Sequence, residues 1–246
     1  MVGRNQSGTR HGKARRDPKS VSRGPKVRVK TARGRTVSSA RWLQRQLNDP
    51  YVAAARQEGY RSRAAYKLLE MNEKHGFLKG ARRVVDLGAA PGGWTQVVTE
   101  ICGPGTSIVG IDLLEVEAVP GAVMIRMDFL DETAEERLLA EMDGPADVVL
   151  SDMAAVTTGH KQTDHLRTMA LCEAALDFAK KVLKPGGSFV AKVLRGGTES
   201  TLLDDMKKQF KTVTHMKPPA SRSESTEMYV IGMGFRGGSD QNTDNG

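Results

Sequence analysis

The stretch VVDLGAAPGGWTQ, residues 84–96, constrains the fold of this chain more than any other part of its sequence. Apolar residues lead into Asp86, a turn follows with glycines at positions 88, 92 and 93, and a helical pattern begins directly afterwards. Glycine lets the backbone turn sharply and approach a ligand, and the new helix offers unpaired N–H groups there. This order predicts a site for a nucleotide-like cofactor, although glycine turns that serve packing, dinucleotides or phosphates share the pattern.

Strands and helices alternate from residue 82 onward, which predicts an α/β fold. The expected strands are 83–87, 107–112, 123–127, 147–152, 188–193, 212–216 and 227–232, and the expected helices are 39–48, 51–57, 62–71, 93–101, 134–142, 163–183 and 200–210. Ser62 is a candidate N-cap, and Pro185-Gly186-Gly187 reads as a helix stop and turn. Near-continuous apolar strands such as DVVLSDM predict a doubly wound, Rossmann-like sheet of seven mostly parallel strands, with helices on both faces and the last strand antiparallel.

Positive charge is concentrated at one end of the chain. Residues 1–40 hold twelve Lys and Arg against a single acid, a net of +11, whereas the whole chain carries +8, so residues 41–246 carry 8 − 11 = −3. A segment rich in Gly, Ser, Pro and Arg lacks the apolar residues that would offset the entropy of ordering. We therefore expect a disordered basic arm at 1–37, a globular domain at 38–236 and a flexible tail at 237–246. The arm is expected to bind RNA phosphates, with a purely solubilising role as the alternative.

Other classes of protein are disfavoured. No apolar run approaches the thickness of a bilayer, and no apolar segment follows the basic N-terminus, so neither a membrane span nor a secretory signal is expected. Cys102 and Cys172 lie far apart with no Cys/His cluster beside either one, which favours free thiols, no metal site and a reducing cytoplasm. We expect a monomer.

Charged residues fall where several expected strands end, and this edge of a doubly wound sheet is where ligands bind. Asp112 is placed to accept hydrogen bonds from ribose hydroxyls, and Asp128 to reach an adenine amino group, although strand-end aspartates are also common as caps and turn formers. Lys192 lies among apolar residues, where an unpaired ammonium is costly to bury. Asp152, on the neighbouring strand, is its expected partner, either for catalysis or as a structural pair.

The motifs together resemble the FtsJ-type ribosomal RNA 2′-O-methyltransferases, and the bacterial branch in particular. YRSRAAYKL, VDLGAAPGGWTQ, IDLL, SDMA, PGGSFVAKV and SRSESTEMYV follow one another in that family's order, from about residue 60 to residue 234. The resemblance implies a metal-free enzyme that transfers a methyl group from S-adenosylmethionine to the 2′-oxygen of a uridine in large-subunit ribosomal RNA. It also implies that the partner is ribosomal RNA, within the large ribosomal subunit.

The same resemblance implies specific site residues. The family's catalytic tetrad maps onto Lys67, Asp152, Lys192 and Glu227, and its cofactor contacts map onto Gly92, Trp94, Asp112, Asp128 and Asp152, with Gly88 of the glycine loop beside them. Without the resemblance, Lys67 would be read as a solvated helix residue, Glu227 as a surface carboxylate and Trp94 as helix–sheet packing. Two loops depart from the family pattern, at Ala155-Val156 and at residues 194–197, and both bear on target choice more than on reaction type.

The expected mechanism assigns Lys192 to accept or steer the proton of the ribose 2′-hydroxyl, although burial, Lys67 and the carboxylates shift its pKa in opposite directions. Together with the basic arm, Arg61, Arg63 and Lys67 are expected to hold RNA phosphates near the cleft. Three alternatives stay open: the same chemistry on transfer RNA or another RNA, a non-catalytic ribosome-assembly factor that binds RNA, and a nicotinamide-dependent oxidoreductase. The last is disfavoured because GAAPGG lacks the GxGxxG pattern.

Overall fold

The computed structural model describes residues 28, 36–156, 158–195 and 199–237. The expected basic arm, apart from residue 28 and the short stretch from 36, and all but the first residue of the expected tail lie outside the described residues. The chain divides into two compact units, Met1–Ala54 and Ala55–Gly246. The motifs quoted above, from residue 60 onward, all belong to the second unit.

The first unit contributes α1 (Val37–Leu47) and the beginning of α2 (Pro50–Glu58), within which the division falls. The second unit contains α3 (Ala64–His75), β1 (Arg83–Leu87), α4 (Gly93–Cys102), β2 (Ser107–Asp112), β3 (Ala122–Arg126), α5 (Ala134–Glu141), β4 (Ala146–Ser151), α6 (Lys161–Val182), β5 (Leu183–Leu194), α7 (Glu199–Gln209), β6 (Phe210–Met216) and β7 (Glu227–Phe235).

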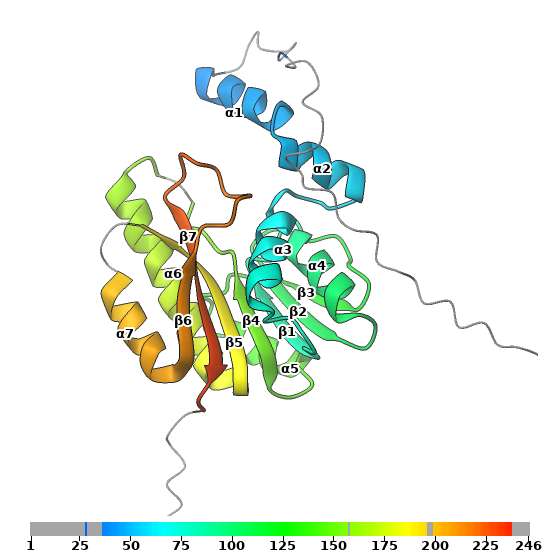
Figure 1. The fold of residues 1–246 in the computed structure, drawn as a ribbon, viewed down its shortest axis with the longest axis vertical. Helices are drawn as coiled ribbons and strands as arrows, with labels where there is room; N and C mark the ends of the chain where they lie inside the picture. The colour runs from blue at the N-terminus through cyan, green and yellow to red at the C-terminus, as the bar shows by residue number, and fades with distance from the viewer. Residues whose placement is uncertain (1–27, 29–35, 157, 196–198, 238–246) are drawn as a thin grey trace, which may run out of the picture. The chain divides into compact units, whose positions relative to one another are not determined.

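The seven strands form one sheet in the order β3-β2-β1-β4-β5-β7-β6 (Figure 1). Neighbours from β3 to β5 pair in parallel, whereas β7 is antiparallel to both β5 and β6. The prediction of a mostly parallel, doubly wound sheet with an antiparallel last strand is therefore confirmed. Strand order reverses between β1 and β4, and their adjacent carboxyl ends open the crevice where such sheets bind ligands.

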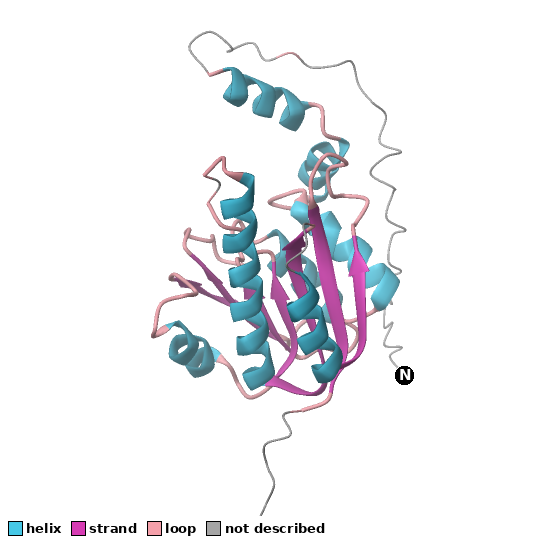
Figure 2. Ribbon diagram, turned by 90° about the vertical axis from the view of Figure 1, so that its left-hand side faces the viewer, coloured by secondary structure: helices cyan, strands magenta, loops and turns pink. Residues whose placement is uncertain are grey.

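Helices cover both faces of the sheet. Figure 1 shows α3 and α4 on one side and α6 and α7 on the other, and the second pair faces the viewer in Figure 2. β1 and β4 are covered on both faces, which explains why they read as continuous apolar runs rather than alternating ones. The central core is built from buried aliphatic and aromatic side chains such as Val149, Leu176 and Phe189. The carboxyl ends of the strands are thereby held on a rigid base.

Two local predictions need correction. The segment Pro185-Gly186-Gly187 does follow the end of α6, but it belongs to β5, which pairs with β4 through a register irregularity between Ala146 and Val148. Ser62 does not cap α3: Arg63 is the N-cap residue, its backbone is helical, and no side-chain capping bond is formed. Instead, the Ser62 hydroxyl fills the space next to Gly93, where an added Cβ would lie 2.6 Å from it.

None of the helices in the part of the chain that the structure describes is both long and apolar enough to cross a bilayer.

Candidate active site

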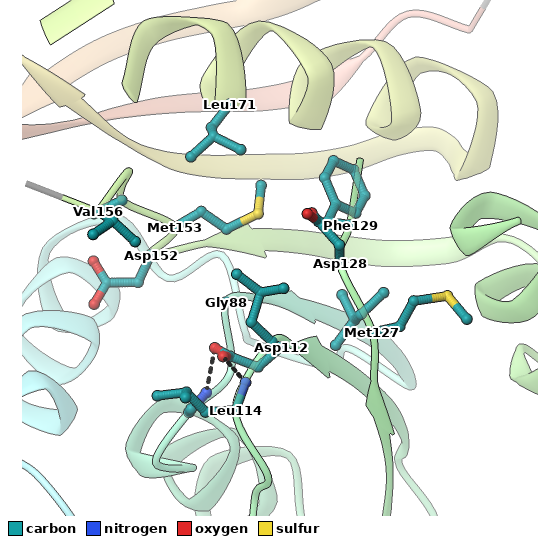
Figure 3. A pocket seen from close by; sticks show the side chains of 14 residues that line it. Gly88, Asp112, Leu114, Met127, Asp128, Phe129, Asp152, Met153, Val156 and Leu171 are labelled. Atoms are coloured by element: carbon teal, nitrogen blue, oxygen red, sulfur yellow. Dashed lines mark hydrogen bonds between the residues drawn. The ribbon is translucent and has the colours of Figure 1, made fainter. Parts of the chain in front are cut away.

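A cavity of about 350 Å³ lies at the carboxyl ends of the parallel strands (Figure 3). Its volume falls in the range of small-molecule sites. The lining residues come from the ends of β1, β2, β3 and β4 and from α6: Gly88, Ala90, Ile111, Asp112, Leu113, Leu114, Met127, Asp128, Phe129, Asp152, Met153, Ala154, Val156 and Leu171. Apolar side chains and a few carboxylates share the wall, which suits a ligand with a flat apolar ring and a polar sugar.

Gly88 lets two parts of this wall approach each other. Its backbone has φ +77°, and a Cβ there would lie 2.8 Å from the Met153 side chain and 2.9 Å from the Met153 backbone nitrogen. The Gly88 N–H donates to the Ile111 carbonyl over 2.9 Å. The glycine loop is therefore pressed between β2 and the loop after β4, and a side chain at position 88 would push that contact apart.

The two strand-end aspartates take different positions. Both carboxylate oxygens of Asp112 accept backbone hydrogen bonds, from Ala90 over 2.9 Å and from Leu114 over 2.8 Å (dashed in Figure 3). Each oxygen keeps a further lone pair for a ligand hydroxyl. Asp128 lines the cavity at its exposed rim and accepts from the Leu130 N–H over 3.0 Å through one carboxylate oxygen. The predicted turn-forming role and the predicted ligand-binding role are therefore compatible at both positions.

The four residues of the expected tetrad come together at one end of this cavity. Lys192 Nζ lies 2.9 Å from Asp152 Oδ1 and donates to the Asp152 backbone carbonyl over 2.7 Å. Lys67 Nζ, from α3, lies 2.6 Å from Glu227 Oε1, at the start of β7. All four side chains are largely buried. Because Asp152 belongs both to this cluster and to the cavity wall, the two sites are continuous.

The charge states of Asp152 and Lys192 follow from the burial and the neighbouring charges of each group. Burial by itself would raise the pKa of the Asp152 carboxyl, but the charges of Lys192 and Lys67 outweigh burial and lower the pKa below its ordinary value. Burial would likewise lower the pKa of Lys192, but the charges of Asp152 and Glu227 raise it above 10.5. Lys192 is therefore an ammonium at neutral pH when the cavity holds no other charge. This settles the sign of a shift that sequence reasoning left open.

Tyr229 is a fifth polar member of the cluster that sequence reasoning missed. Its hydroxyl donates to Asp152 Oδ1 over 2.6 Å and accepts from Lys67 Nζ over 3.1 Å. Burial and the charges of Asp152 and Glu227 raise the pKa of this hydroxyl, so Tyr229 acts as a neutral donor. One signal was available: residues 227 and 229 alternate along a strand and therefore share a face. Only the register, which pairs Lys192 with Tyr229, places that face against the lysine.

Trp94 and Gly92 lie outside the cavity wall in this structure. The Trp94 indole is buried, its Nε1 donates to the Ala64 carbonyl over 2.8 Å, and its ring lies 5.7 Å from that of Tyr229. Gly92 caps α4 in a left-handed conformation, and a Cβ there would lie 2.5 Å from Arg61 Nη1. Their assignment as cofactor contacts stays a prediction, and Trp94 has an evident packing role beside it.

Arg61 and Arg63 both contact backbone carbonyls in this structure, and the phosphate binding expected for them stays a prediction. The Arg61 guanidinium donates to the carbonyls of Pro91, Glu117 and Ala118. These hydrogen bonds connect the glycine loop to the segment after β2. Arg63 donates to the carbonyl of Ala220 in the loop between β6 and β7. Guanidinium groups directed at backbone carbonyls hold loops in position.

Both backbone groups of Ala220 bond to side chains at α3. Its carbonyl accepts from Arg63, and its N–H donates to Glu70 Oε2 over 2.7 Å. The spacing of Arg63, Lys67 and Glu70 places all three on one face of α3. The next residue in the loop, Ser221, donates to Glu227 Oε1 over 3.0 Å. One face of α3 therefore supplies Lys67 and also holds the loop between β6 and β7, whose Ser221 contacts Glu227, the partner of Lys67.

We predict that Glu70→Ala lowers kcat about tenfold, because a hydrogen bond to a charged group is worth about 1.5–3 kcal/mol and its loss frees the loop beside Glu227. Glu70→Gln keeps an acceptor for the Ala220 N–H and should recover most of the rate. Exposed Glu73, on the same helix, provides the matched control in Glu73→Ala. Steady-state kinetics with each variant check this, and an unchanged kcat in Glu70→Ala would remove the positioning role.

Within the described ranges, no group of three or more His, Cys, Asp and Glu side chains is arranged to hold a metal ion.

The chain is similar in sequence and in fold to known proteins. The FtsJ-like methyltransferase family model matches residues 60–235. A protein of Novosphingobium aromaticivorans is 61% identical over 215 residues, which cover 87% of this chain and 96% of that protein. A protein of Parvibaculum lavamentivorans is 56% identical over 248 residues, which cover 97% of this chain and 98% of that protein. Both are named ribosomal RNA large subunit methyltransferase E. A solved structure described as a ribosomal RNA methyltransferase, from Plasmodium falciparum, is 29% identical and aligns with TM-score 0.64 over 73% of this chain and all of that one.

Proposed function

The chain belongs to the FtsJ-like methyltransferase family, and from that premise we propose that it methylates the ribose 2′-oxygen of a uridine in large-subunit ribosomal RNA. The cofactor is S-adenosylmethionine, and the apolar wall together with the Asp112 carboxylate fits its adenosine half. One observation carries the proposal: Asp152 lines the cofactor cavity and also holds Lys192, so a methyl donor and a proton-handling group meet at one carboxylate.

The chain's own part in the reaction is alignment and proton transfer. When bound, S-adenosylmethionine supplies a methyl group on a sulfonium, and the departing thioether is neutral. The 2′-hydroxyl is a weak nucleophile, so holding it in line with that methyl group and receiving its proton are what the protein contributes. Lys67 supplies a positive charge to the cluster, and the Tyr229 hydroxyl donates to Asp152 and so orients the carboxylate that holds Lys192.

Lys192 is the proposed proton acceptor, and it must first lose a proton of its own. In the free protein its raised pKa keeps it charged. A positive charge in the cavity beside Asp152 competes with the lysine for that carboxylate, which lowers the pKa of Lys192 toward neutrality. With the cofactor bound, the Lys192 amine would accept the 2′-hydroxyl proton as the oxygen takes up the methyl group and the neutral thioether leaves, and the resulting ammonium would return the proton to solvent.

Glu227→Gln tests this order of events through pH. The negative charge of Glu227 helps to raise the pKa of Lys192, so its removal lowers that pKa and more of the lysine is neutral at a given pH. The rising limb of the kcat–pH profile should therefore move to lower pH in the variant. Burial raises the pKa of Asp86 to about 7, in the same window, but Asp86 titrates in both proteins and its effect cancels in their comparison. A limb that stays in place would argue against proton acceptance by Lys192.

The function itself is tested by transfer of labelled methyl groups from S-adenosylmethionine to large ribosomal subunits taken from cells that lack this protein. Label at one ribose, resistant to alkaline cleavage and absent with Lys192→Ala, is the expected result. Label on transfer RNA alone would keep the chemistry and change the substrate. Cofactor binding without label on any RNA would contradict methyl transfer and favour a role in assembly.

We also propose that the protein works in the cytoplasm, where a bacterial large subunit is available to it. The ribosomal substrate in the names of its relatives supports this compartment. The monomeric state expected from the sequence stays a prediction.

A further inference from the structure

α1, in the first unit, carries an aromatic side chain that the described part of the chain leaves half exposed. The helix begins after Thr36, whose hydroxyl oxygen accepts from the Ser39 N–H over 3.2 Å, so it is a properly capped helix. Trp42 is 51% exposed on it, whereas Trp94, the other tryptophan of the chain, is 3% exposed. A half-exposed indole leaves a large apolar area in water, which marks its face for a partner.

The helical period places two arginines beside this indole. At about 100° per residue, Arg45 lies about 60° around the axis from Trp42, and Arg41 lies about 40° beyond Arg45. Both arginines are exposed. We refer to Arg41, Trp42 and Arg45 as the Trp42 face. The helix VSSARWLQRQL itself contains no acidic residue.

The apolar side of α1 points elsewhere. Ala40, Leu43 and Leu47 cluster about 100–160° around the axis from Trp42, by the same period. Trp42 therefore lies apart from the apolar side of the helix, of which Leu43 is partly buried and Leu47 is 36% exposed. Its neighbours are cations, and an aromatic ring among guanidinium groups matches the surface that stacks a base while holding the phosphates next to it.

We propose that the Trp42 face binds an unpaired nucleobase of the RNA substrate, by stacking on Trp42, with Arg41 and Arg45 on the flanking phosphates. Charge supports this occupant: the face continues a segment in which residues 1–40 carry a net +11. The proposal rests on the proposed function, since it assumes that RNA is the substrate. It adds a second point of contact, outside the methyl-transfer cavity, that reads single-stranded character rather than base identity.

Full-length protein and single-stranded oligouridylate test the face. Stacking should quench indole fluorescence in the wild-type protein, and this part of the quenching should disappear in Trp42→Phe. Trp42→Ala should weaken binding by between about fivefold and about a hundredfold, from stacking worth about 1–3 kcal/mol per base. Arg45→Ala should instead flatten the dependence of affinity on salt. Gln44→Ala, about 160° around the axis, is the matched control, and thermal unfolding verifies that each variant is folded.

Equal RNA affinities of Trp42→Ala and Gln44→Ala would overturn the proposal, and so would equal quenching by RNA in the wild-type protein and in Trp42→Phe. A Trp42 indole that is already shielded from acrylamide before RNA is added would also overturn it, because the chain itself would then cover Trp42. Methyl transfer to ribosomal subunits is measured in parallel. Unchanged RNA binding by Trp42→Ala with intact methylation refutes the Trp42 face alone. Quenching by RNA without methylation of any subunit refutes the proposed function and leaves the face supported.

Discussion

Replacing Lys192 with alanine is expected to lower kcat for methyl transfer by about 10²–10⁴-fold, the contribution of a positioned proton-transfer group. The affinity for S-adenosylmethionine should change far less, because the lysine contacts Asp152 from the side of the cluster and does not line the cavity. Single-turnover rates and calorimetric titration of the cofactor separate the two effects. A variant that turns over at the wild-type rate would eliminate Lys192 from the reaction.

Two further variants give this experiment its controls. Lys180 also forms ion pairs, with Asp177 over 2.7 Å and Asp205 over 3.0 Å, but it lies on α6 away from the cavity, so Lys180→Ala should leave kcat unchanged. Lys192→Arg keeps the charge but cannot give up a proton at any working pH. Activity restored by arginine would show that Lys192 supplies charge only, whereas an inactive, folded arginine variant supports proton acceptance.

Loss of the lysine also leaves a buried carboxylate with fewer partners. Breaking a buried ion pair typically costs about 3–5 kcal/mol. Here Asp152 keeps the Tyr229 hydroxyl at 2.6 Å and remains close to the charge of Lys67, so we expect a smaller loss of stability. Thermal unfolding of Lys192→Ala therefore belongs beside its kinetics, to separate a folded, inactive enzyme from an unfolded one.

The fold and the strand-end residues were accessible from the sequence for a clear reason. Continuous apolar runs mark strands that helices cover on both faces, and the charged residue that follows such a run must lie at the ligand-binding edge of the sheet. Asp112 and Asp152 were located in this way, and Lys192 by its place among apolar residues; the structure brings Asp152 and Lys192 within 2.9 Å of each other. Periodicity and burial are local properties, so a single sequence displays them.

What the sequence did not reveal depends on register and on contacts between distant segments. Tyr229 joins the cluster only because β7 pairs antiparallel with β5 in one particular register. The contacts of the Arg61 guanidinium with the carbonyls of Glu117 and Ala118, more than fifty residues away, had no signal in the sequence. Position 70 gave no signal at all, because its partner is a backbone N–H in a loop 150 residues downstream. Such pairings are set by tertiary geometry, which no local pattern encodes.

Replacing Asp152 with asparagine should damage both binding and chemistry, unlike the lysine variant. This carboxylate lines the cavity, and it is the shared acceptor for Lys192 and Tyr229. We expect kcat to fall by at least about 10²-fold and the Kd for S-adenosylmethionine to rise about tenfold, since a positively charged cofactor loses the nearest negative charge of the cluster. Asp128→Asn, at the exposed rim, is the matched control and should raise Kd without a comparable loss of kcat. An unchanged Kd in Asp152→Asn would mean that this carboxylate serves the lysines and not the cofactor.

Stability against pH provides a readout of Asp152 that does not depend on activity. Its pKa is lowered in the folded protein, so the ionised carboxylate contributes stability above its ordinary pKa of 3.8, and that contribution disappears as the pH falls through the lowered value. The pKa of Lys192 is raised, so its contribution is present below 10.5 and is lost as the pH rises through the raised value. Wild type should therefore unfold with a larger free energy than Asp152→Asn near neutral pH, and the difference should shrink below about pH 4. A difference that persists unchanged into acid would place the effect of the substitution in packing, because only an ionised carboxylate loses its advantage by gaining a proton.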